Sequence, residues 1–241
     1  MIERSAILYG GDFCAALKNA VAAVCGAGAV GSFAVEALAR LGVGSFLLYD
    51  FDAFELSNIN RQLCALRSTI GAQKVDAQKA RILDINPDAN VEANNVFIDA
   101  DVAARIAARR PSVVIDAVDC VAAKAALAKA ASEAGVPFVA SMGAARRKNP
   151  LAVKTADIYA TTGCPLAARL RKELRKAGVK GFKCVYSDEP AAEGTHVKGG
   201  QESADGGRNF KKTIGSSVIV TGVFGLNLAN LAIREITGGN F

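Results

Sequence analysis

Short apolar runs alternate with longer helical patterns along the first 142 residues of the chain. The runs are rich in Val, Leu, Ile and Ala and predict buried strands, whereas the segments between them carry the Ala, Leu, Lys and Glu that favour helices. Strands are predicted over 21–25, 45–50, 91–96, 113–116 and 137–141, and helices over 30–41, 75–85, 102–109 and 122–134. This alternation is typical of the α/β class, with a doubly wound, Rossmann-like and mostly parallel sheet between two layers of helices.

The alternation continues more loosely after Asn149 and Pro150. It predicts a strand-like segment over 151–159, a strongly basic helix over 165–177 and a strand over 183–186. We therefore expect further strands of the C-terminal half to extend the same sheet, with further helices packed against it. Gly and polar residues dominate 193–212, which predicts a mobile loop. We expect one domain over 1–241, with a nucleotide-binding core over 1–145 and a substrate-side extension over 146–241.

A stretch without charged residues covers 213–233 and has the length of a membrane-spanning helix. It contains small and polar residues, among them Gly215, Gly222, Asn227 and Asn230. These residues favour a buried strand, a glycine turn and a packed helix over a transmembrane helix. We therefore expect no membrane span.

Composition and charge narrow the function classes. With 51% hydrophobic and 22% charged residues, the chain is neither disordered nor collagen-like. The net charge of +6 gives a modest preference for anionic partners such as nucleotides or RNA. The six cysteines are scattered without a C-x-x-C pair, which argues against a disulfide framework and a zinc ribbon. The N-terminus does not resemble a secretory signal, so we expect a cytoplasmic protein.

A glycine-rich loop, GAGAVG, follows the first predicted strand and opens a helix. In that context Gly26, Gly28, Ala29 and Gly31 let the backbone approach a phosphate or ribose, with the helix N-terminus supplying positive potential. Asp50 ends the next predicted strand, where a carboxylate can accept both ribose hydroxyls. The pattern predicts a nucleotide site; the alternative is a glycine turn that serves tight packing.

Two cations follow Asp50, on either side of Gly71. Arg61 and Lys74 could converge on a triphosphate and offset charge that develops during group transfer, although ordinary surface cations are the alternative. Asp119 lies just past the fourth predicted strand. Because the carboxyl ends of parallel strands meet at one edge, Asp119 and Asp50 should face one crevice, and Asp119 could hold Mg²⁺.

Four of these segments together resemble a known family. The GAGAVG loop, the run LLYDFDAFELSNINRQ, the GAQK tetrapeptide and the VIDAVD turn are similar to the ATP-binding core of the ubiquitin-activating-like, ThiF-type adenylyltransferases, which activate a carboxylate with ATP. The resemblance implies that ATP is bound by Gly26, Gly28, Ala29, Gly31, Asp50, Asp52, Ser57, Asn58, Arg61, Gln62 and Lys74. It also implies that Asp119 holds the metal.

The resemblance extends to the N-terminus. Arg4 matches a family arginine that reaches the ATP of the partner subunit, which implies a homodimer. The implied catalytic residues are Asp119, Arg61, Lys74 and Arg4.

The second half indicates a branch of the family. The segments ADIY, CPLA and VYSDEP are similar to those of the bacterial tRNA threonylcarbamoyladenosine dehydratases. That resemblance implies ATP-dependent cyclisation of N6-threonylcarbamoyladenosine beside the anticodon, through activation of its side-chain carboxylate. Cys120 follows Asp119 where the protein-activating branch has asparagine, which fits the tRNA branch. The cluster Arg146, Arg147 and Lys148 is denser in charge than that branch leads us to expect.

Basic residues of the second half are candidates for contacts with tRNA phosphates. The alternative is a solvated helix face. The candidates are Arg146, Arg147, Lys148, Arg169, Arg171 and Lys172.

Two other functions stay open on the sequence. One is an adenylyltransferase that activates the C-terminus of a ubiquitin-like sulfur-carrier protein, which would add a sulfur-transfer partner; the lack of C-x-x-C zinc knuckles counts against it. The other is a non-catalytic nucleotide sensor or NAD-binding module on the same fold. Retention of Arg4, Arg61, Lys74 and Asp119 favours an enzyme.

Overall fold

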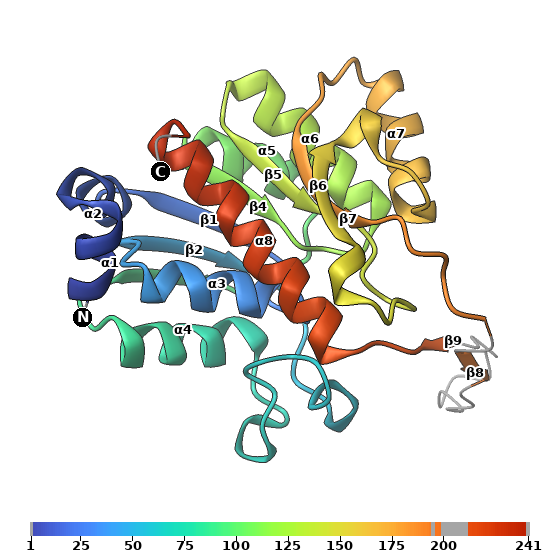
Figure 1. Ribbon diagram of the computed structural model, residues 1–241, viewed down its shortest axis with the longest axis horizontal. Helices are drawn as coiled ribbons and strands as arrows, with labels where there is room; N and C mark the ends of the chain where they lie inside the picture. Colours follow the sequence, from blue (N-terminus) through green and yellow to red (C-terminus); the bar gives the residue numbers. More distant parts are fainter. Residues whose placement is uncertain (1, 194–195, 199–211, 240–241) are drawn as a thin grey trace.

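A seven-stranded sheet organises the chain (Figure 1). The computed structural model describes residues 2–193, 196–198 and 212–239. The strands of the sheet are β1 (Val21–Cys25), β2 (Ser45–Tyr49), β3 (Asn90–Asn94), β4 (Val113–Asp116), β5 (Phe138–Ser141), β6 (Val153–Asp157) and β7 (Lys183–Ser187). Their order is β3-β2-β1-β4-β5-β7-β6, and every pairing is parallel except that of β6 with β7.

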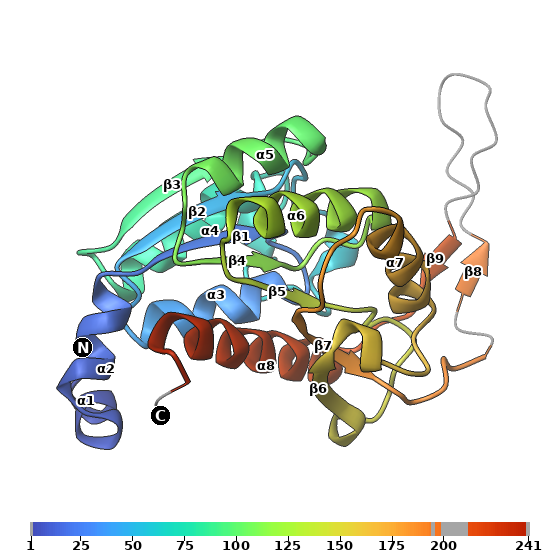
Figure 2. The ribbon, with the colours of Figure 1, turned by 90° about the horizontal axis from the view of Figure 1, so that it is seen from above.

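Helices cover both faces of the sheet (Figure 2). Those of the described residues are α1 (Glu3–Tyr9), α2 (Gly11–Lys18), α3 (Gly31–Arg40), α4 (Lys74–Ile85), α5 (Ala100–Ala108), α6 (Val121–Ala134), α7 (Pro165–Lys176) and α8 (Val218–Thr237). Helices α2, α3, α4 and α8 share one apolar cluster with the sheet, and α5, α6 and α7 share the other. The predicted doubly wound α/β fold is therefore confirmed, including the extension of the sheet by β6 and β7.

The two clusters follow from the alternation of side chains along each strand. On β1, Ala22 and Val24 face the α3 side, whereas Ala23 and Cys25 face the α6 side, and all four are buried. Successive residues of a strand point to opposite faces, so a strand covered on both sides reads as a continuous apolar run. This explains why β1, β2, β4 and β5 could be predicted from short runs of apolar residues, whereas β3 is an edge strand with Val91 as its buried residue.

The strand order reverses at β1, which has β2 on one side and β4 on the other. In open α/β sheets a crevice forms at such a reversal, beyond the carboxyl ends of the strands. The loop after β1 turns sharply there: Gly26 has a φ of 93°, and a Cβ on Gly31 would lie 1.8 Å from the carbonyl oxygen of Gly26. Glycine is thus required at both positions for the loop to fold back over β1.

Three segments differ from the prediction. The segment 151–159 divides into a 3₁₀ turn (Pro150–Ala152), strand β6 and a second 3₁₀ turn (Ile158–Ala160), because the Asn149 and Asp157 side chains each accept a backbone N–H two residues further on, at 2.9 Å. The N-terminal helices α1 and α2 were not predicted. Two further 3₁₀ turns, Leu56–Asn58 and Arg67–Thr69, lie between β2 and α4.

The predicted mobile loop over 193–212 lies mostly outside the described residues. Its described ends include β8 (His196–Lys198) and β9 (Lys212–Ile214), which pair antiparallel. The strand expected after 213 is this short β9, and Ile214 is half exposed rather than buried.

Helix α8 is the one helix among the described residues that is long and apolar enough to cross a membrane. Of its most apolar window, 56% is buried, and the helix packs along α3 and across β5 and β7. Its apolar side, with Val220, Phe224 and Leu228, belongs to the core cluster on the α3 side of the sheet. The packed helix predicted from the sequence is confirmed.

Candidate nucleotide-binding site

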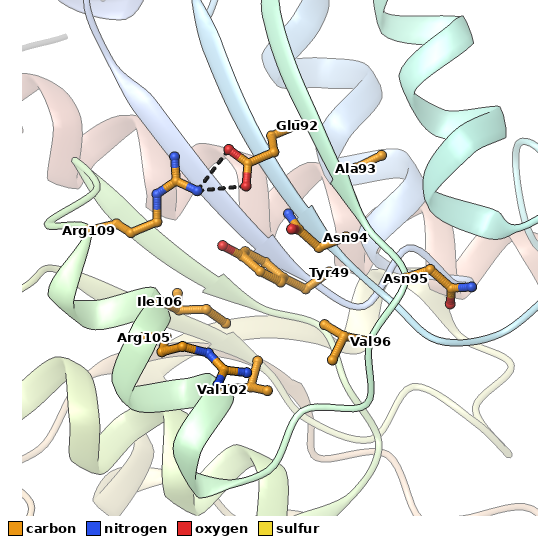
Figure 3. A pocket seen from close by; sticks show the side chains of 10 residues that line it. All are labelled: Tyr49, Glu92, Ala93, Asn94, Asn95, Val96, Val102, Arg105, Ile106 and Arg109. Carbon is orange, nitrogen blue, oxygen red and sulfur yellow. Dashed lines mark hydrogen bonds and ion pairs between the residues drawn. The ribbon is translucent and has the colours of Figure 1, made fainter.

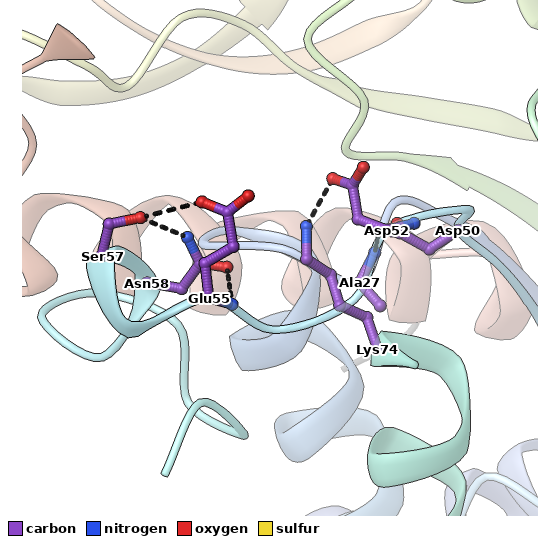
Figure 4. Close-up of polar contacts among 7 residues, drawn as sticks. All are labelled: Ala27, Asp50, Asp52, Glu55, Ser57, Asn58 and Lys74. Atoms are coloured by element: carbon purple, nitrogen blue, oxygen red, sulfur yellow. Dashed lines mark hydrogen bonds and ion pairs between the residues drawn. The ribbon is translucent and has the colours of Figure 1, made fainter. Parts of the chain in front are cut away.

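The carboxylate of Asp50 joins the first two strands at their carboxyl ends (Figure 4). Its Oδ2 accepts a hydrogen bond from the backbone N–H of Ala27 in the glycine loop at 2.7 Å, and its Oδ1 accepts one from the N–H of Asp52 at 2.9 Å. Asp50 is buried. Charge-assisted bonds to backbone N–H groups are stronger than neutral ones, so the loop and the end of β2 are held in one arrangement.

Lys74 and Asp52 form an ion pair beside Asp50 (Figure 4). The Lys74 Nζ lies 2.6 Å from the Asp52 Oδ2, and the Lys74 N–H donates to the Asp52 carbonyl at 3.0 Å. The lysine side chain is 7% exposed and the aspartate side chain 48%. A nearly buried ammonium at the start of α4 therefore has a partner that solvent reaches.

A polar turn lies next to this pair. The Asn58 Oδ1 accepts from the Glu55 N–H at 3.2 Å, and the Ser57 Oγ bonds to both Asn58 and Glu55 side chains. The Arg61 Nη1 donates to the Ser57 carbonyl at 2.8 Å and to the Asn60 Oδ1 at 2.9 Å. The turn is thus folded by its own side chains, and two hydrogen bonds from Nη1 fix the Arg61 guanidinium against it.

Gln62 lies between this turn and the glycine loop. Its side chain is buried, and its Oε1 has no hydrogen-bond partner among the described residues. A Cβ on Gly28 would lie 3.9 Å from the Gln62 Nε2. The segment is fixed to α3 by a bond from the Leu63 N–H to the Ser32 Oγ at 3.2 Å. An unpaired buried acceptor is costly, which is the condition expected where a ligand supplies the missing donor.

Asp119 lies in the turn between β4 and α6 and is exposed. The glycine loop touches this turn: a Cβ on Gly26 would lie 2.9 Å from the Ala117 carbonyl carbon and 3.1 Å from the Val118 nitrogen. The structure therefore brings Asp119 to the edge of the sheet where Asp50 and Lys74 lie. Among the described residues no group of three or more His, Cys, Asp or Glu side chains could hold a metal ion.

Arg4 lies at the opposite side of the sheet, beyond the amino ends of the strands. Helices α1 and α2 pack beyond the start of the strands, since the Ser45 N–H donates to the Ala20 carbonyl and a Cβ on Gly42 would meet the Ile2 side chain at 3.1 Å. Strand β2 separates this side from Asp50 by about 16 Å, given its five residues. Arg4 is exposed on α1 and remote from the site of its own chain.

The predicted basic cluster at 146–148 is not a set of three free surface cations, and this part of the prediction needs correction. Arg147 is 3% exposed; its Nη2 donates to the Gly163 carbonyl at 3.1 Å, and its Nε and Nη1 have no partner among the described residues. The half-buried Arg146 donates from Nε and Nη2 to the Ala192 carbonyl, at 3.0 and 2.8 Å. Only Lys148 of the three is exposed. Backbone atoms bind these guanidinium groups, a tertiary detail that charge counting misses.

The cations of α7 divide in a similar way. Arg169 and Lys172 are exposed, whereas the half-buried Arg171 donates to the Thr161 carbonyl at 3.0 Å. The exposed pair lies three residues apart and therefore on one side of the helix.

One aromatic pair at this edge was not predicted. The rings of Phe51 and Phe97 meet edge to face, with centroids 5.2 Å apart, and both are about half exposed. Phe51 directly follows Asp50 and Phe97 lies just past β3, so their position after two neighbouring strands was the available signal.

A long-range hydrogen bond at the polar turn was not predicted either. The Asn60 Nδ2 donates to the Ser216 carbonyl at 3.2 Å and links the turn to the start of α8. Nothing local in the sequence indicates this contact.

Burial disfavours the thiolate form of three cysteines of the core. Burial raises the pKa of Cys64 to about 11 and that of Cys184 to about 12, and burial also raises the pKa of Cys25 well above its usual value. Protonated thiols react poorly. Cys120, next to Asp119, is the exposed cysteine of the chain.

A separate hollow lies away from this site (Figure 3). It has a volume of about 490 Å³, lies between β3 and α5, and is lined by Tyr49, Arg105 and the ion-paired Arg109 and Glu92 among others. Burial raises the pKa of the Tyr49 hydroxyl within it. None of the residues predicted to bind ATP lines this hollow, so it is distinct from the site described above.

Comparisons with known proteins agree with this geometry. The chain matches the ThiF family over residues 2–240. It is 43% identical over 188 residues to the tRNA threonylcarbamoyladenosine dehydratase of Bacillus subtilis, covering 78% of this chain and 74% of that one. The crystal structure of the Escherichia coli tRNA N6-threonylcarbamoyladenosine dehydratase in complex with ATP superimposes with a TM-score of 0.86 and 32% identity, over 98% of this chain and 93% of that one.

A shorter match concerns the sulfur-carrier alternative. The molybdopterin-synthase adenylyltransferase of Escherichia coli is 37% identical over 148 residues, which cover 60% of this chain and 58% of that one.

Proposed function

The chain belongs to the ThiF family, and we propose that it is an ATP-dependent tRNA threonylcarbamoyladenosine dehydratase, which cyclises N6-threonylcarbamoyladenosine beside the anticodon of tRNA. The observation that carries the proposal is the likeness, over 98% of the chain, to a dehydratase of this name in complex with ATP. The residues expected to bind ATP also gather at one edge of the sheet, although they come from separate segments of the chain.

The site suits an ATP molecule. The Asp50 carboxylate, already oriented by the Ala27 N–H, would accept the ribose hydroxyls, and the loop from Gly26 to Gly31 would lie against the nucleotide. The Gln62 side chain, whose Nε2 would lie 3.9 Å from a Cβ on Gly28, carries the unpaired Oε1 and supports a ligand near this loop. Ser57, Asn58 and Arg61 would contact the phosphates from the folded polar turn.

Lys74 would stabilise charge on the transferred group. Its nearly buried ammonium is paired with Asp52, whose half-exposed carboxylate can be replaced by a phosphate oxygen. A cation held in a largely buried position, before the reaction begins, stabilises developing negative charge more than a mobile surface cation does. Arg61 would add a second positive charge from the neighbouring turn.

A magnesium ion fits this set of donors. Mg²⁺ typically takes one or two carboxylates, and substrate phosphates and water complete its six ligands. The exposed carboxylate of Asp119 would supply the protein ligand. The ion would neutralise phosphate charge.

The reaction needs no covalent enzyme intermediate. Once ATP activates the side-chain carboxylate of the modified adenosine, a nucleophilic atom of the same side chain attacks the carbonyl carbon. The carboxylate oxygen leaves with the phosphorus-containing group, which accounts for the loss of one water. Such an intramolecular step has a high effective molarity, so the protein mainly activates, orients and excludes water. The high pKa values of Cys25, Cys64 and Cys184 agree with this chemistry.

A homodimer would complete the site. Arg4 is too remote to serve its own chain but is exposed on a helix that buries no residue of its own. Large apolar side chains are exposed near it and along α8: Ile7 is 86% exposed, Leu8 72% and Leu226 53%. Figure 2 shows that α1 and α8 lie on the same side of the sheet. An apolar surface of this kind is typical of an interface with another protein chain, and a second copy would bring its Arg4 to this site.

The exposed cations of α7 would hold the tRNA backbone. The helix begins at the edge of the sheet that carries the ATP residues, because its N-cap Cys164 lies against Gly143, two residues beyond β5. Arg169 and Lys172 lie further along the helix, exposed and on one side of it. Lys148 would add a third contact; a tRNA substrate also agrees with a cytoplasmic location and the net charge of +6.

Activation of a ubiquitin-like sulfur carrier is the second candidate. The match to a molybdopterin-synthase adenylyltransferase supports it, but that match covers 60% of the chain, whereas the match to the dehydratase structure covers 98%. The sequence also lacks the C-x-x-C pairs of zinc knuckles. A sulfur-transfer protein therefore stays a secondary proposal for a partner.

Mass spectrometry of tRNA nucleosides separates the two candidates. We would incubate tRNA carrying threonylcarbamoyladenosine with the protein, ATP and Mg²⁺, using a mild work-up because the cyclic product hydrolyses easily, with the Lys74→Ala variant as control. The proposal expects an ATP-dependent loss of the mass of one water from that nucleoside. No change in mass, together with pyrophosphate exchange when a ubiquitin-like carrier is added, would contradict it and favour the second candidate.

A further inference from the structure

An ion pair without any solvent exposure lies beneath the proposed metal ligand. Asp116 is the last residue of β4, Lys124 lies in the first half of α6, and the Lys124 Nζ is 2.9 Å from the Asp116 Oδ2. Both side chains are 0% exposed. Aspartate and lysine are rarely buried to this degree, and neither residue is among those expected to bind ATP. The pair therefore needs an explanation of its own.

The neighbours of the pair within the sheet are uncharged and buried. By the register of the sheet, Asp116 lies between Cys25 on β1 and Ala140 on β5, and Cys184 on β7 follows in the same row. All three neighbours are buried in the apolar cluster on the α6 side of the sheet. Removing one partner of such a pair would leave a buried charge uncompensated, so the two side chains hold each other in place.

The second oxygen of Asp116 connects the pair to the turn after β4. The Asp116 Oδ1 accepts a hydrogen bond from the Val118 N–H at 3.1 Å. On the other side of the turn, the Lys124 N–H donates to the Cys120 carbonyl at 3.0 Å, within the first turn of α6. One carboxylate thus ties the start of the turn to the helix at its end. Asp119 is the residue between the two attachment points.

The glycine loop closes the other side of this turn. The Ala117 N–H donates to the Cys25 carbonyl at 2.8 Å, and a Cβ on Gly26 would lie 2.9 Å from the Ala117 carbonyl carbon. The turn is therefore held between the loop expected to carry ATP and the buried pair. A shift of the pair would change the position of Asp119 relative to that loop.

We propose that Asp116 and Lys124 are positioning residues, a buried clip that holds the 117–120 turn so that Asp119 faces the phosphates of ATP. This inference rests on the proposed function, because it takes Asp119 to act on ATP and its metal. A pair that served stability alone could be replaced by apolar side chains without loss, as is often the case for buried ion pairs. A clip cannot be replaced so simply, because the Val118 N–H needs its acceptor.

Two double variants test the clip and differ in a single respect. Both carry Lys124→Met, which removes the ammonium with little change in side-chain length. One adds Asp116→Asn, whose oxygen can still accept from the Val118 N–H; the other adds Asp116→Leu, which cannot. If the leucine variant does not fold, Asp116→Ala with Lys124→Met takes its place. Thermal unfolding of each variant establishes that it is folded at the temperature of the measurements.

Three measurements report on the turn. Amide hydrogen exchange by NMR gives the protection of the Val118 N–H. ATP affinity is measured by calorimetry with and without Mg²⁺, and AMP affinity serves as the control for the nucleotide loop. The same substitutions are repeated in an Asp119→Ala background, because two residues that act through one another do not have additive effects.

The clip predicts a difference between the two variants. In the leucine variant, the protection of the Val118 N–H against hydrogen exchange should fall at least tenfold. Most of the increase in ATP affinity that Mg²⁺ gives the parent protein should also be lost, with AMP affinity unchanged. The asparagine variant should keep its Val118 protection and its Mg²⁺-dependent ATP affinity within about threefold of the parent values. In the Asp119→Ala background, neither double variant should change ATP affinity beyond the effect of Asp119→Ala itself. Equal behaviour of the two variants would overturn the clip. If Asp119→Ala itself leaves ATP affinity and turnover unchanged, the proposed role of Asp119 is wrong; Val118 protection then decides separately whether the pair holds the turn.

Discussion

The ammonium of Lys74 lies 2.6 Å from the carboxylate of Asp52, and the lysine is nearly buried while the aspartate is half exposed. The two residues belong to different segments, one at the start of α4 and the other just past β2, and a backbone bond from the Lys74 N–H to the Asp52 carbonyl holds them together. Because the aspartate is accessible, an anionic ligand can replace its carboxylate as the partner of the Lys74 ammonium without moving the lysine.

Replacing Lys74 by alanine should lower ATP turnover by about 100-fold or more, because the variant loses a positive charge held in place before the reaction. The fold should persist, since only one end of α4 changes. Turnover of ATP with modified tRNA measures the loss, and far-ultraviolet circular dichroism controls for folding. Turnover within threefold of the parent protein would remove Lys74 from the proposed set.

Replacing Asp119 by alanine should abolish ATP turnover with a cost in unfolding free energy below about 0.5 kcal/mol, because the side chain is exposed and holds no structural bond among the described residues. ATP turnover at increasing Mg²⁺ concentrations is the measurement, and the variant should stay inactive even at Mg²⁺ concentrations that saturate the parent protein. Turnover within threefold of the parent protein would contradict the proposed role.

The arginine of α1 can be tested by mixing inactive subunits. Arg4→Ala and Lys74→Ala should each be inactive alone, because every site of either homodimer lacks one group. After subunit exchange, heterodimers would contain one site with both groups, so activity of up to about a quarter of the parent protein should return at equal mixing. Analytical ultracentrifugation would confirm that both variants are dimers. Failure of fully exchanged heterodimers to recover activity would exclude a shared site.

The exposed cations of α7 should contribute to tRNA affinity through salt-dependent contacts. Replacing both Arg169 and Lys172 by alanine should reduce the slope of log affinity against log salt concentration by about 1 to 2, since each phosphate contact contributes just under one. The matched control is Arg171→Ala, because the Arg171 guanidinium is already bound to the Thr161 carbonyl. Equal slopes for the double variant and the parent protein would show that α7 does not contact the phosphate backbone.

Stability should depend on pH through Glu36 of α3. Burial raises the pKa of this carboxyl, but hydrogen bonds from Arg81 and Arg40, at 2.6 and 2.7 Å, outweigh burial and hold the pKa below its usual 4.5. A lowered pKa in the folded state stabilises the protein above 4.5, and that stabilisation is lost as the pH falls through the folded pKa. Glu36→Gln should therefore cost about 1 to 2 kcal/mol at pH 7 and progressively less below pH 4.5. Urea unfolding at both ends of this range measures the difference.

Local patterns were sufficient to predict most of the sheet and the center of the candidate site. The glycine loop and Asp50 come directly after predicted strands. Because the carboxyl ends of parallel strands lie on one side of the sheet, their positions in the sequence were sufficient to place them together. Helix α1 could not be predicted in this way: it buries none of its residues, so it lacks the apolar periodicity that marks a packed helix.

Tertiary contacts explain the other differences. Arg147 has the same local context as Lys148, yet its guanidinium is buried against the Gly163 carbonyl, and only the folded chain reveals this. The Asp116–Lys124 pair was missed for a similar reason, since an aspartate at a strand end and a lysine in an alanine-rich helix are each ordinary by themselves. Long-range partners, rather than residue types, distinguish such residues from the surface charges around them.

The reversal of strand order at β1 has a consequence for how the protein folds. The two turns that meet across this reversal, after β1 and after β4, are about 90 residues apart in the chain. A folding intermediate that contains only the N-terminal half of the sheet would hold the glycine loop without its opposing turn. Because such non-local contacts form slowly, competence to bind nucleotide should emerge late in refolding. Nucleotide that binds only the completed sheet would then raise the free energy of unfolding of the whole domain.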